Sequence, residues 1–189
     1  MSLTLSSMLP LGTAAPDFSL PNLNGEFVSI NDFKDSKAYL IAFICVHCPY
    51  VKHLEREFAS LASKYMKKSV AVIAINSNDP RYDPDDDLGG MVQQAAKYCF
   101  SFPYLVDKSQ DVAKLYQAAC TPDFYVFDEN KKLVYRGQFD DTRPGGGHPT
   151  GKHLKDAIDA VLNKKTILKN QKPSSGCNIK WNPGNEPKF

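Results

Sequence analysis

Apolar residues along the chain fall into short continuous runs and into runs with helical spacing. The continuous runs at 38–44 and 70–76 have the length and β-rich composition of strands that are buried on both faces. From Pro49 to about Met66, apolar residues recur every three or four positions, which predicts an amphipathic helix. These three segments predict a strand–helix–strand unit at the centre of an α/β fold.

The rest of the pattern predicts further strands and helices around this unit. Alternating or short apolar runs predict strands at 26–30 and 103–107 and a β-hairpin made of 123–128 and 133–139. Helices are predicted at 91–100, 109–118 (with Ser109 as its N-cap) and 151–165, a turn at 31–36, and an extended lead-in over 1–25. The chain has no internal repeat, so we expect a central mixed β-sheet flanked by helices.

The C-terminal segment differs from the rest. Residues 166–189 lack periodicity, yet they place Cys177, Ile179 and Trp181 in an otherwise polar stretch. We therefore expect one domain over residues 1–165 and a C-terminal tail that packs on it. A length of 189 residues with 42% hydrophobic residues suits a single core of this kind.

Charge and hydropathy limit the functional classes. The chain has 23 basic and 21 acidic residues, so its net charge of +2 favours neither nucleic acid nor an anionic membrane as partner. Its longest apolar run is far shorter than the ~18 residues that a membrane span needs. The N-terminus shows neither the basic region nor the apolar region of a signal peptide, so we expect a cytoplasmic protein.

Two of the five cysteines form a CxxC motif where the first long strand is expected to meet the first helix. Cys45 follows the strand and Cys48 precedes the helix, whose N-terminal N–H groups and dipole favour a thiolate. Two intervening residues allow the pair to cycle between dithiol and disulfide. His47 adds a potentially cationic neighbour that would favour the thiolate further. The junction therefore predicts a redox-active pair.

A zinc half-site is the alternative interpretation of the same motif. A structural zinc ion needs two more closely spaced ligands, and no second CxxC or HxxxH follows in the sequence. We therefore expect no metal and no organic cofactor.

Several further stretches carry a family resemblance. They are "APDFSL" (15–20), "PYLVD" (103–107), "ACTPDF" (119–124), "GQFDD" with "RP" (137–144) and the C-terminal "GCNIKW". With the CxxC followed by proline, the chain resembles the thioredoxin-like superfamily, specifically a peroxiredoxin-like subgroup of the AhpC/TSA (redoxin) group, over nearly its full length. The resemblance implies a thioredoxin-like fold in which Pro122 is a cis-proline that faces the CxxC.

The sequence departs from both parent families of this group. Cys48 falls on the peroxidatic cysteine of peroxiredoxins, but Cys45 replaces the Thr or Ser of that motif and Ile41 replaces its Pro. The activating arginine of that family would fall near Pro122. In comparison with thioredoxin, Val46-His47 replaces Gly-Pro, Ile44 replaces the Trp before the motif, and Tyr39 replaces a buried Asp.

From these features we expect a thiol–disulfide oxidoreductase in which Cys45 attacks a substrate disulfide and Cys48 resolves the mixed disulfide. A thiol peroxidase with Cys48 as the peroxidatic residue stays open as an alternative, and so does a non-catalytic redox sensor or metal-binding module. The resemblance implies a disulfide-containing protein or small thiol as substrate, and a thioredoxin or glutathione system as reductant.

The resemblance also places the neighbours of Pro122 at the rim of the site. We expect the backbone of Thr121 to be free to pair with a substrate. Cys120 is either a third thiol that relays a disulfide, in the longest version onward to Cys177, or a packing residue.

Other motifs have simpler interpretations. The loop at 77–90 resembles a calcium loop with Asp83, Asp85 and Asp87 as ligands, but it lacks the glycine and the glutamate of that motif, so a solvated loop is preferred. The stretch from Gly146 to Lys152 nearly matches a phosphate-binding loop, and a flexible loop is preferred there too.

Three single residues complete the set of candidates. We expect His53 on the surface, Arg143 paired with Asp140 or Asp141, and Cys99 buried as a small apolar residue.

Overall fold

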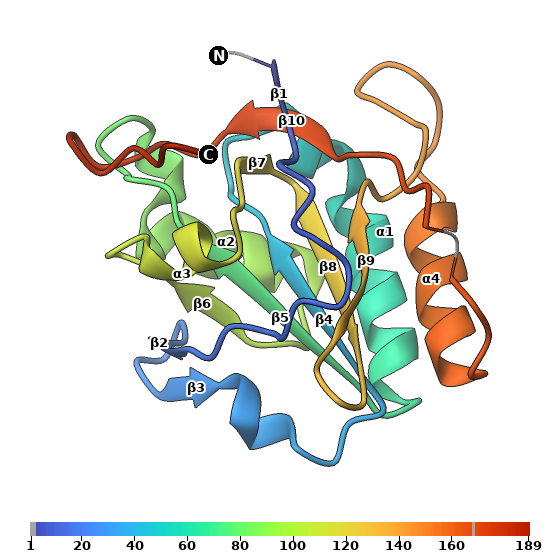
Figure 1. The fold of residues 1–189 in the computed structure, drawn as a ribbon. Coiled ribbons are helices and arrows are strands. Elements are labelled where there is room, and N and C mark those ends of the chain that lie inside the picture. Colours follow the sequence, from blue (N-terminus) through green and yellow to red (C-terminus); the bar gives the residue numbers. More distant parts are fainter. Residues whose placement is uncertain (1–2, 168) are drawn as a thin grey trace.

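The computed structural model describes residues 3–167 and 169–189, and a five-stranded mixed sheet forms its centre (Figure 1). The order of strands is β6-β5-β4-β8-β9. Their bounds are Ala38–Phe43 for β4, Val70–Asn76 for β5, Tyr104–Val106 for β6, Asp123–Asp128 for β8 and Leu133–Gly137 for β9. β5 is parallel to β4 and to β6, whereas β8 is antiparallel to β4 and to β9. The mixed sheet predicted from the sequence is therefore present.

β4 is the central strand, and its burial on both faces explains its continuous apolar sequence. Ile41 pairs with Ile73 on one side and with Tyr125 on the other. Because side chains alternate along a strand, Leu40 belongs to the apolar cluster on one face of the sheet and Ile41 to the cluster on the other.

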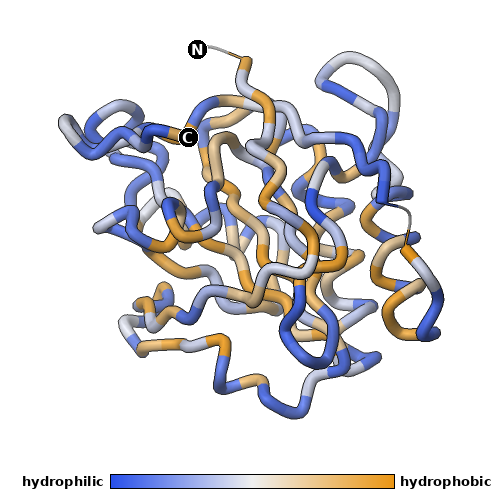
Figure 2. Tube along the Cα trace, in the orientation of Figure 1, coloured by the Kyte–Doolittle hydropathy of each residue, from blue (hydrophilic) through white to orange (hydrophobic). Residues whose placement is uncertain are grey.

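Three helices cover one face of the sheet. They are α1 (Pro49–Met66), α2 (Leu88–Tyr98) and α4 (Lys152–Leu162). Pro49 opens α1, where its missing N–H is no loss, and the apolar stripe of the helix faces the sheet. Phe58 in this stripe packs against the rings of Phe102, Phe124 and Phe139. Figure 2 shows hydrophobic residues concentrated in the strands and hydrophilic ones in the outer loops.

The N-terminal segment and a short helix cover the other face. This layer contains β2 (Ser19–Pro21), β3 (Phe27–Ser29), the 3-10 helix η1 (Ile30–Phe33) and α3 (Asp111–Leu115). Tyr116, which follows α3, packs its ring against Phe43 and Tyr125 of the sheet. No helix among the described residues is long and apolar enough to cross a bilayer.

A second sheet joins the two ends of the chain. It has the order β1-β10-β7, with β1 at Leu3–Leu5, β7 at Cys120–Thr121 and β10 at Ser175–Asn178. Figure 1 shows β10 crossing above the N-terminal end of α1, with β1 beside it. The tail thus adds a strand next to β7, whereas the division of the chain at residue 165 stays a prediction.

Some element boundaries differ from the prediction. α2 begins at Leu88 because the side chain of Asp87 caps it and accepts a 2.8 Å hydrogen bond from the N–H of Gly90. The helix ends at Tyr98, and Cys99 adopts the left-handed conformation with φ 55°. The prediction that Cys99 is buried is wrong, because this cap leaves it exposed.

Two further boundaries reflect backbone geometry. The N-cap of α3 is Gln110, in the left-handed region with φ 66°, and not Ser109. β9 ends at Gly137, whose φ is 142°, because the chain of the tail passes close by. A Cβ at Gly137 would lie 2.1 Å from the carbonyl oxygen of Lys172, so only glycine fits.

Candidate active site

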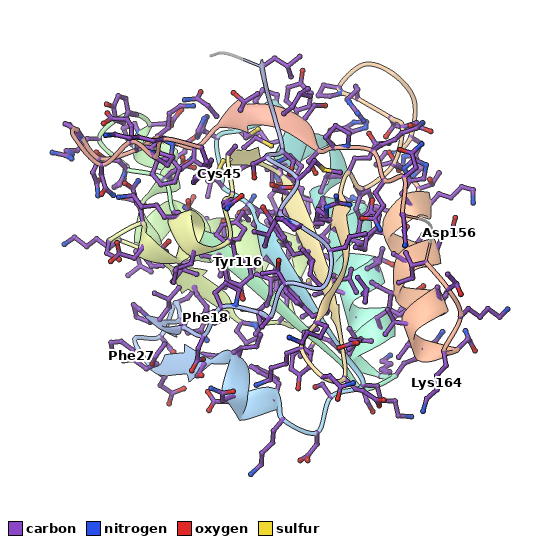
Figure 3. The ribbon with its side chains drawn as sticks, viewed as in Figure 1. Phe18, Phe27, Cys45, Tyr116, Asp156 and Lys164 are labelled. Carbon is purple, nitrogen blue, oxygen red and sulfur yellow. The ribbon has the colours of Figure 1, made fainter. Side chains whose placement is uncertain are left out.

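The CxxC motif lies where β4 gives way to α1, as the apolar pattern predicts. β4 ends at Phe43, and Cys48 is the N-cap of α1. Cys45 and Cys48 are both thiols, and both are 0% exposed. Figure 3 shows Cys45 close to β7 and β10. The reactive sulfurs are therefore present at the expected junction but are covered by other parts of the chain.

Thr121 contacts both sulfurs. Its Oγ1 lies 3.2 Å from Cys45 Sγ, and its carbonyl oxygen accepts a 3.1 Å hydrogen bond from the thiol of Cys48. The Thr121–Pro122 peptide bond is cis, the configuration that the family resemblance implied. The backbone of Thr121 is not free, however, because β10 pairs with it, with Cys177 as its partner. The sequence could not reveal this pairing because the tail shows no strand pattern.

Hydrogen-bond donors around Cys48 favour its thiolate. The thiol of Cys45 donates to it, as do the thiol and backbone N–H of Cys177 and the backbone N–H of Val51. These donors outweigh burial, and they lower the pKa of Cys48 to about 5. Of the two cysteines, Cys48 is the one whose surroundings favour the thiolate.

Cys45 has the opposite environment. Burial raises its pKa well above the ordinary value, and the hydrogen bond to Cys48 and the charge of Asp86 raise it further. The two buried cysteines thus have pKa values shifted in opposite directions. This separation of pKa values is the usual condition for one cysteine to attack and the other to follow.

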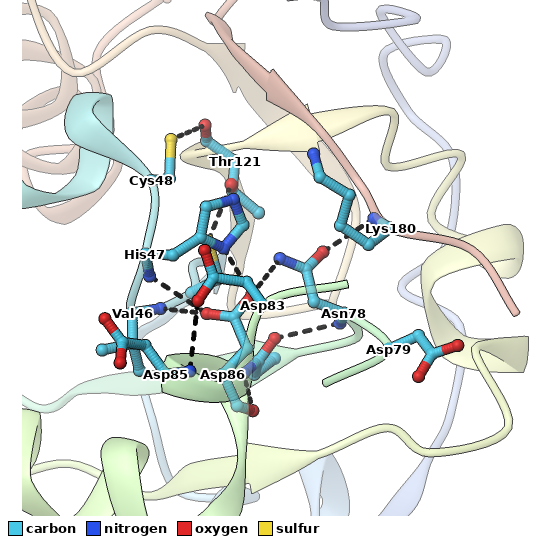
Figure 4. Close-up of polar contacts among 12 residues, drawn as sticks. Val46, His47, Cys48, Asn78, Asp79, Asp83, Asp85, Asp86, Thr121 and Lys180 are labelled. Atoms are coloured by element: carbon cyan, nitrogen blue, oxygen red, sulfur yellow. Dashed lines mark hydrogen bonds and ion pairs between the residues drawn. The ribbon is translucent and has the colours of Figure 1, made fainter. Parts of the chain in front are cut away.

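Asp86 and His47 form a buried pair beside Cys45. Oδ2 of Asp86 lies 2.5 Å from Nδ1 of His47, which in turn lies 3.8 Å from Cys45 Sγ. Oδ1 of Asp86 accepts hydrogen bonds of 2.8 and 3.0 Å from the backbone N–H groups of Val46 and His47 (Figure 4). The carboxylate thus fixes the backbone between the two cysteines and also holds the imidazole.

This pairing shifts both pKa values. The hydrogen bond to Asp86 raises the pKa of His47, in spite of burial. Burial would raise the pKa of Asp86, but hydrogen bonds from His47 and Asn78 outweigh burial and lower it. Nδ2 of Asn78 donates to Asp86 at 2.7 Å, and Oδ1 of Asn78 accepts from the backbone N–H of Lys180 at 2.9 Å (Figure 4). The C-terminal tail is therefore part of the support of this pair.

Sequence reasoning missed Asp86 because it lies in the aspartate-rich loop that was interpreted as solvated. Its neighbours have local roles: Asp83 accepts a hydrogen bond from the N–H of Asp85, and Asp87 caps α2. The calcium-loop alternative finds no support, because the grouping of potential ligands found among the described residues involves Asp86 with Cys45 and His47 instead.

The same three side chains are the candidate metal ligands of the site. One atom from each of Cys45, His47 and Asp86 lies within 4.8 Å of the others, and Nε2 of His47 is buried without a hydrogen-bond partner. The thiolate, imidazole and carboxylate donors suit zinc or a similar ion. Nδ1 of His47 and the carboxylate are already bonded to each other, however, so an ion would have to bind through Nε2 or break this bond.

The two remaining buried cysteines have different positions. Cys120 is 0% exposed and its Sγ lies 3.9 Å from the carbonyl oxygen of Pro122, whereas Cys177 lies directly beside Cys48. Burial and the charge of Asp123 raise the pKa of Cys120 well above its ordinary value. These surroundings favour the packing role for Cys120, and it is Cys177 that approaches the redox pair.

Other predicted candidates have structural contacts. Arg143 bonds neither carboxylate that was expected; it donates to the backbone oxygen of Asp140 at 2.9 Å and to the side chain of Gln138. His53 is half-buried, and its Nε2 lies 2.9 Å from Oγ1 of Thr142.

In the stretch that resembles a phosphate-binding loop, backbone N–H groups bind the carboxylate of Asp140. The backbone N–H groups of Thr150 and Gly151 both donate to the carboxylate of Asp140, at 2.5 and 2.7 Å. Two of the N–H groups in this stretch are therefore occupied by a side chain of the protein.

Comparisons with known proteins identify the family of this chain. Residues 11–136 match the AhpC/TSA family model, which covers more than half of the chain, so the protein belongs to the AhpC/TSA family. It is similar to the thiol-disulfide oxidoreductase ResA of Bacillus thuringiensis subsp. konkukian, with 27% identity over 134 residues that cover 69% of this chain and 71% of ResA.

Two solved structures extend the comparison. An uncharacterized conserved protein from Geobacillus kaustophilus is 49% identical, with a TM-score of 0.93 over 97% of this chain and 98% of that one. A thiol:disulfide interchange protein of the thioredoxin family from Chlorobium tepidum is 14% identical, with a TM-score of 0.64 over 81% of this chain and 98% of that one. The fold is thioredoxin-like, as the motifs implied.

Proposed function

We propose that Cys45 and Cys48 are the redox couple of this protein, a thiol–disulfide oxidoreductase of the AhpC/TSA family. The observation that carries the proposal is the pairing of a thiolate-favouring Cys48 with the thiol of Cys45 at the start of a helix. The similarity to ResA, itself a thiol-disulfide oxidoreductase, supports the same activity.

The reductive reaction would proceed in two exchange steps. Cys48 thiolate attacks one sulfur of the substrate disulfide, so that a mixed disulfide forms and the first substrate thiolate leaves. Cys45 then attacks Cys48 Sγ, the bond between Cys48 and the substrate breaks, and the proton of Cys45 passes to the departing substrate sulfur, which leaves as a thiol. The substrate gains two electrons, and the protein ends with a Cys45–Cys48 disulfide.

These roles reverse the order expected from the sequence, where Cys45 was the attacking residue. The physical reason is the distribution of donors. Cys48 is the helix N-cap and accepts from several N–H and S–H groups, whereas Cys45 faces the charge of Asp86. A thiolate is more stable in the first environment than in the second.

Reduction of insulin by dithiothreitol tests the couple. Cys45→Ser and Cys48→Ser should each lose catalysis, and Cys45→Ser should accumulate a mixed disulfide because its attacking thiol remains. Cys99→Ser is the matched control, because Cys99 is an exposed thiol at the C-cap of α2, outside the motif. Full activity in both variants of the motif would refute the couple, and mixed disulfide only in Cys48→Ser would restore Cys45 as the attacking residue.

A thiol peroxidase is the second candidate, favoured by the lowered pKa of Cys48. Arg143 lines a small cavity with Pro122, near the position where the resemblance places the activating arginine. Its guanidinium is bonded to Gln138 and to the backbone of Asp140, so it does not polarise a peroxide in this arrangement. We expect slow oxidation of Cys48 by hydrogen peroxide. Rapid loss of the thiol at stoichiometric peroxide, with turnover after re-reduction, would favour the peroxidase instead.

A metal-binding module is the third candidate, favoured by the arrangement of Cys45, His47 and Asp86. Equilibrium dialysis of the reduced protein against zinc separates it from the oxidoreductase. We expect no stoichiometric binding, because His47 and Asp86 are bonded to each other. One tightly held zinc ion that is lost in His47→Ala would make the metal site the primary function.

The substrate and partners follow from this chemistry. We propose a disulfide-containing protein or small disulfide as substrate and a dithiol reductant, such as a thioredoxin or glutathione system, as partner. The cytoplasmic location expected from the sequence stays a prediction, and cell fractionation would test it.

A further inference from the structure

β10 lies on the edge of β7, directly beside the redox pair. Cys177 is the antiparallel partner of Thr121, whose Oγ1 and carbonyl oxygen contact the sulfurs of Cys45 and Cys48. The tail therefore occupies the backbone edge where an extended peptide could pair beside these sulfurs.

A glycine allows this strand to lie flat on the site. A Cβ built at Gly176 would lie 2.0 Å from the carbonyl oxygen of Thr121 and 3.3 Å from Cδ of Pro122. Any side chain at this position would therefore force β10 away from Thr121. The close contact between β10 and Thr121 therefore depends on glycine at position 176, next to Cys177.

Cys177 is in direct contact with Cys48. Its thiol and its backbone N–H both donate to the sulfur of Cys48, and Cys45, Cys48 and Cys177 belong to one buried cluster. Cys177 is 3% exposed and the other two are 0% exposed. Cys48 thus has a thiol neighbour in each of two elements, the CxxC loop and β10.

Cys48 is one of the causes that set the pKa of Cys177. Burial and the hydrogen bond to Cys48 raise the pKa of Cys177 to about 12, so Cys177 stays protonated while Cys48 is a thiolate. Once Cys48 is part of a disulfide its charge is gone, and this contribution to the raised pKa disappears. Cys177 then becomes a better nucleophile at the moment when Cys48 becomes an electrophile.

We propose that Cys177 is a third redox thiol of this site, which exchanges with the Cys45–Cys48 disulfide to form a Cys48–Cys177 disulfide that fixes β10 over the site. This inference rests on the proposed couple. Cys177 loses its proton and attacks Cys48 Sγ, the bond between Cys45 and Cys48 breaks, and Cys45 leaves as a thiolate and takes up a proton. One disulfide replaces another, so the step needs no external oxidant or reductant.

A substrate and the tail compete for the same position. Because both sulfurs of the couple are fully covered, an external disulfide reaches them only when β10 has moved away from Thr121. After the substrate leaves with its electrons, β10 returns and the exchange with Cys177 follows. The substrate that fits this position is a polypeptide with its cysteine in an extended segment, as Cys177 is in β10.

Disulfide mapping of the full chain tests the proposal. The reduced protein is oxidised with diamide, its remaining thiols are alkylated at low pH, and its peptides are identified by mass spectrometry. Wild type should contain both Cys45–Cys48 and Cys48–Cys177 disulfides, and monomeric Cys45→Ser should contain mainly Cys48–Cys177. Cys120→Ser is the matched control and should give the wild-type pattern, because Cys120 is equally buried but its sulfur contacts Pro122.

The outcomes separate this inference from the proposed couple. A Cys45–Cys48 disulfide in wild type, without Cys48–Cys177 in wild type or in Cys45→Ser, would overturn the inference and leave the couple intact. Absence of Cys45–Cys48 from oxidised wild type would overturn the couple. A Cys48–Cys177 disulfide in Cys45→Ser would support the inference that Cys177 reacts with Cys48.

Gly176→Ala tests the covering strand without changing a sulfur. Its added Cβ should displace β10, so alkylation of Cys48 by iodoacetamide should become at least about tenfold faster while the near-ultraviolet circular dichroism stays native. Ser175→Ala, which removes an atom from the preceding residue, should react at the wild-type rate. Equal rates in Gly176→Ala and wild type would show that β10 does not limit access to Cys48, against the proposal.

Discussion

The carboxylate of Asp86 lies 2.5 Å from Nδ1 of His47, and both residues are buried beside Cys45. Their contact joins the aspartate-rich loop to the CxxC loop, 39 residues apart in the sequence. Because Asp86 also accepts the N–H groups of Val46 and His47, one side chain sets the shape of the redox loop and its electrostatics.

Removing the charge of Asp86 should impair the redox couple. In Asp86→Asn the pKa of His47 should fall, because the carboxylate is the main cause of its rise. Disulfide exchange should slow by about 100-fold, because the carboxylate no longer holds the CxxC loop and the imidazole in place, and a misplacement of about 1 Å can have an effect of this size. NMR titration of the imidazole and insulin reduction measure the two effects.

The control for this change is Asp85→Asn, which alters an exposed carboxylate of the same loop. Its His47 titration and activity should match those of wild type. An unchanged pKa for His47 in Asp86→Asn would contradict the role assigned to the pair.

The reduced protein should contain a thiolate at mildly acidic pH. Cys48 has a pKa of about 5, so the ultraviolet absorbance of a thiolate should rise near that pH in wild type and not in Cys48→Ser. Cys120→Ser should keep the rise, because burial raises the pKa of Cys120. Because folding lowers the pKa of Cys48 from 9.0, its ionisation stabilises the folded state. This stabilisation is fully present above pH 9.0 and is lost as the pH falls toward 5. A wild-type titration that begins only above pH 8 would contradict the assignment.

The ionisation of Asp123 should lower stability as the pH rises, whereas that of Cys48 raises it. Asp123 is 0% exposed, and burial raises its pKa from 3.8 to about 7, although the hydroxyl of Tyr125 donates a hydrogen bond to it. Because the folded-state pKa is raised, the stability contributed by its protonated form is present below about pH 4 and is lost as the pH rises through about 7. Each pKa unit corresponds to about 1.4 kcal/mol.

Denaturant unfolding at pH 5 and pH 8 measures this effect. The stability of wild type relative to Asp123→Asn should be greater at pH 5 than at pH 8. The titratable side chains that face Asp123 include Tyr135 and Cys120, whose pKa values are raised and which stay neutral in this window. The same difference at both pH values would show that Asp123 has an ordinary pKa.

Truncation of Phe58, in the core beneath the site, should destabilise the protein. This ring is 0% exposed and packs against three other phenylalanine rings, so Phe58→Ala should reduce the free energy of unfolding by about 3–5 kcal/mol. Phe27→Ala, at a position that is 69% exposed, should change it by about 0.5 kcal/mol or less. Similar losses in the two variants would contradict the packing described here.

The elements that the sequence predicts well are those with their own internal pattern. β5 and α1 have the predicted bounds, Val70–Asn76 and Pro49–Met66, because a buried strand and an amphipathic helix each repeat a simple arrangement of apolar residues. β10 has no such pattern in its sequence SGCN. It forms because β1 and β7 lie on either side of it, and such pairing cannot be derived from four residues.

The site divides in the same manner. The CxxC is a local motif, and its position at the end of a strand follows from the apolar runs on either side. Nothing local distinguishes Asp86 from Asp83, Asp85 or Asp87, because only the fold turns one carboxylate of that loop inward. The contact between Cys177 and Cys48 depends likewise on the path of the tail.

The three-stranded sheet that joins the two ends of the chain covers the redox centre with paired strands. Its outer strand, β1, pairs with β10 along Leu3–Leu5, so uncovering the sulfurs means breaking or bending strand pairing rather than opening a pocket. Small oxidants and reductants then react only as often as this sheet opens, however nucleophilic the thiolate is. A polypeptide that supplies its own strand replaces the hydrogen bonds that are lost. We therefore expect partners that pair through their backbone to react faster with the redox centre than small molecules do.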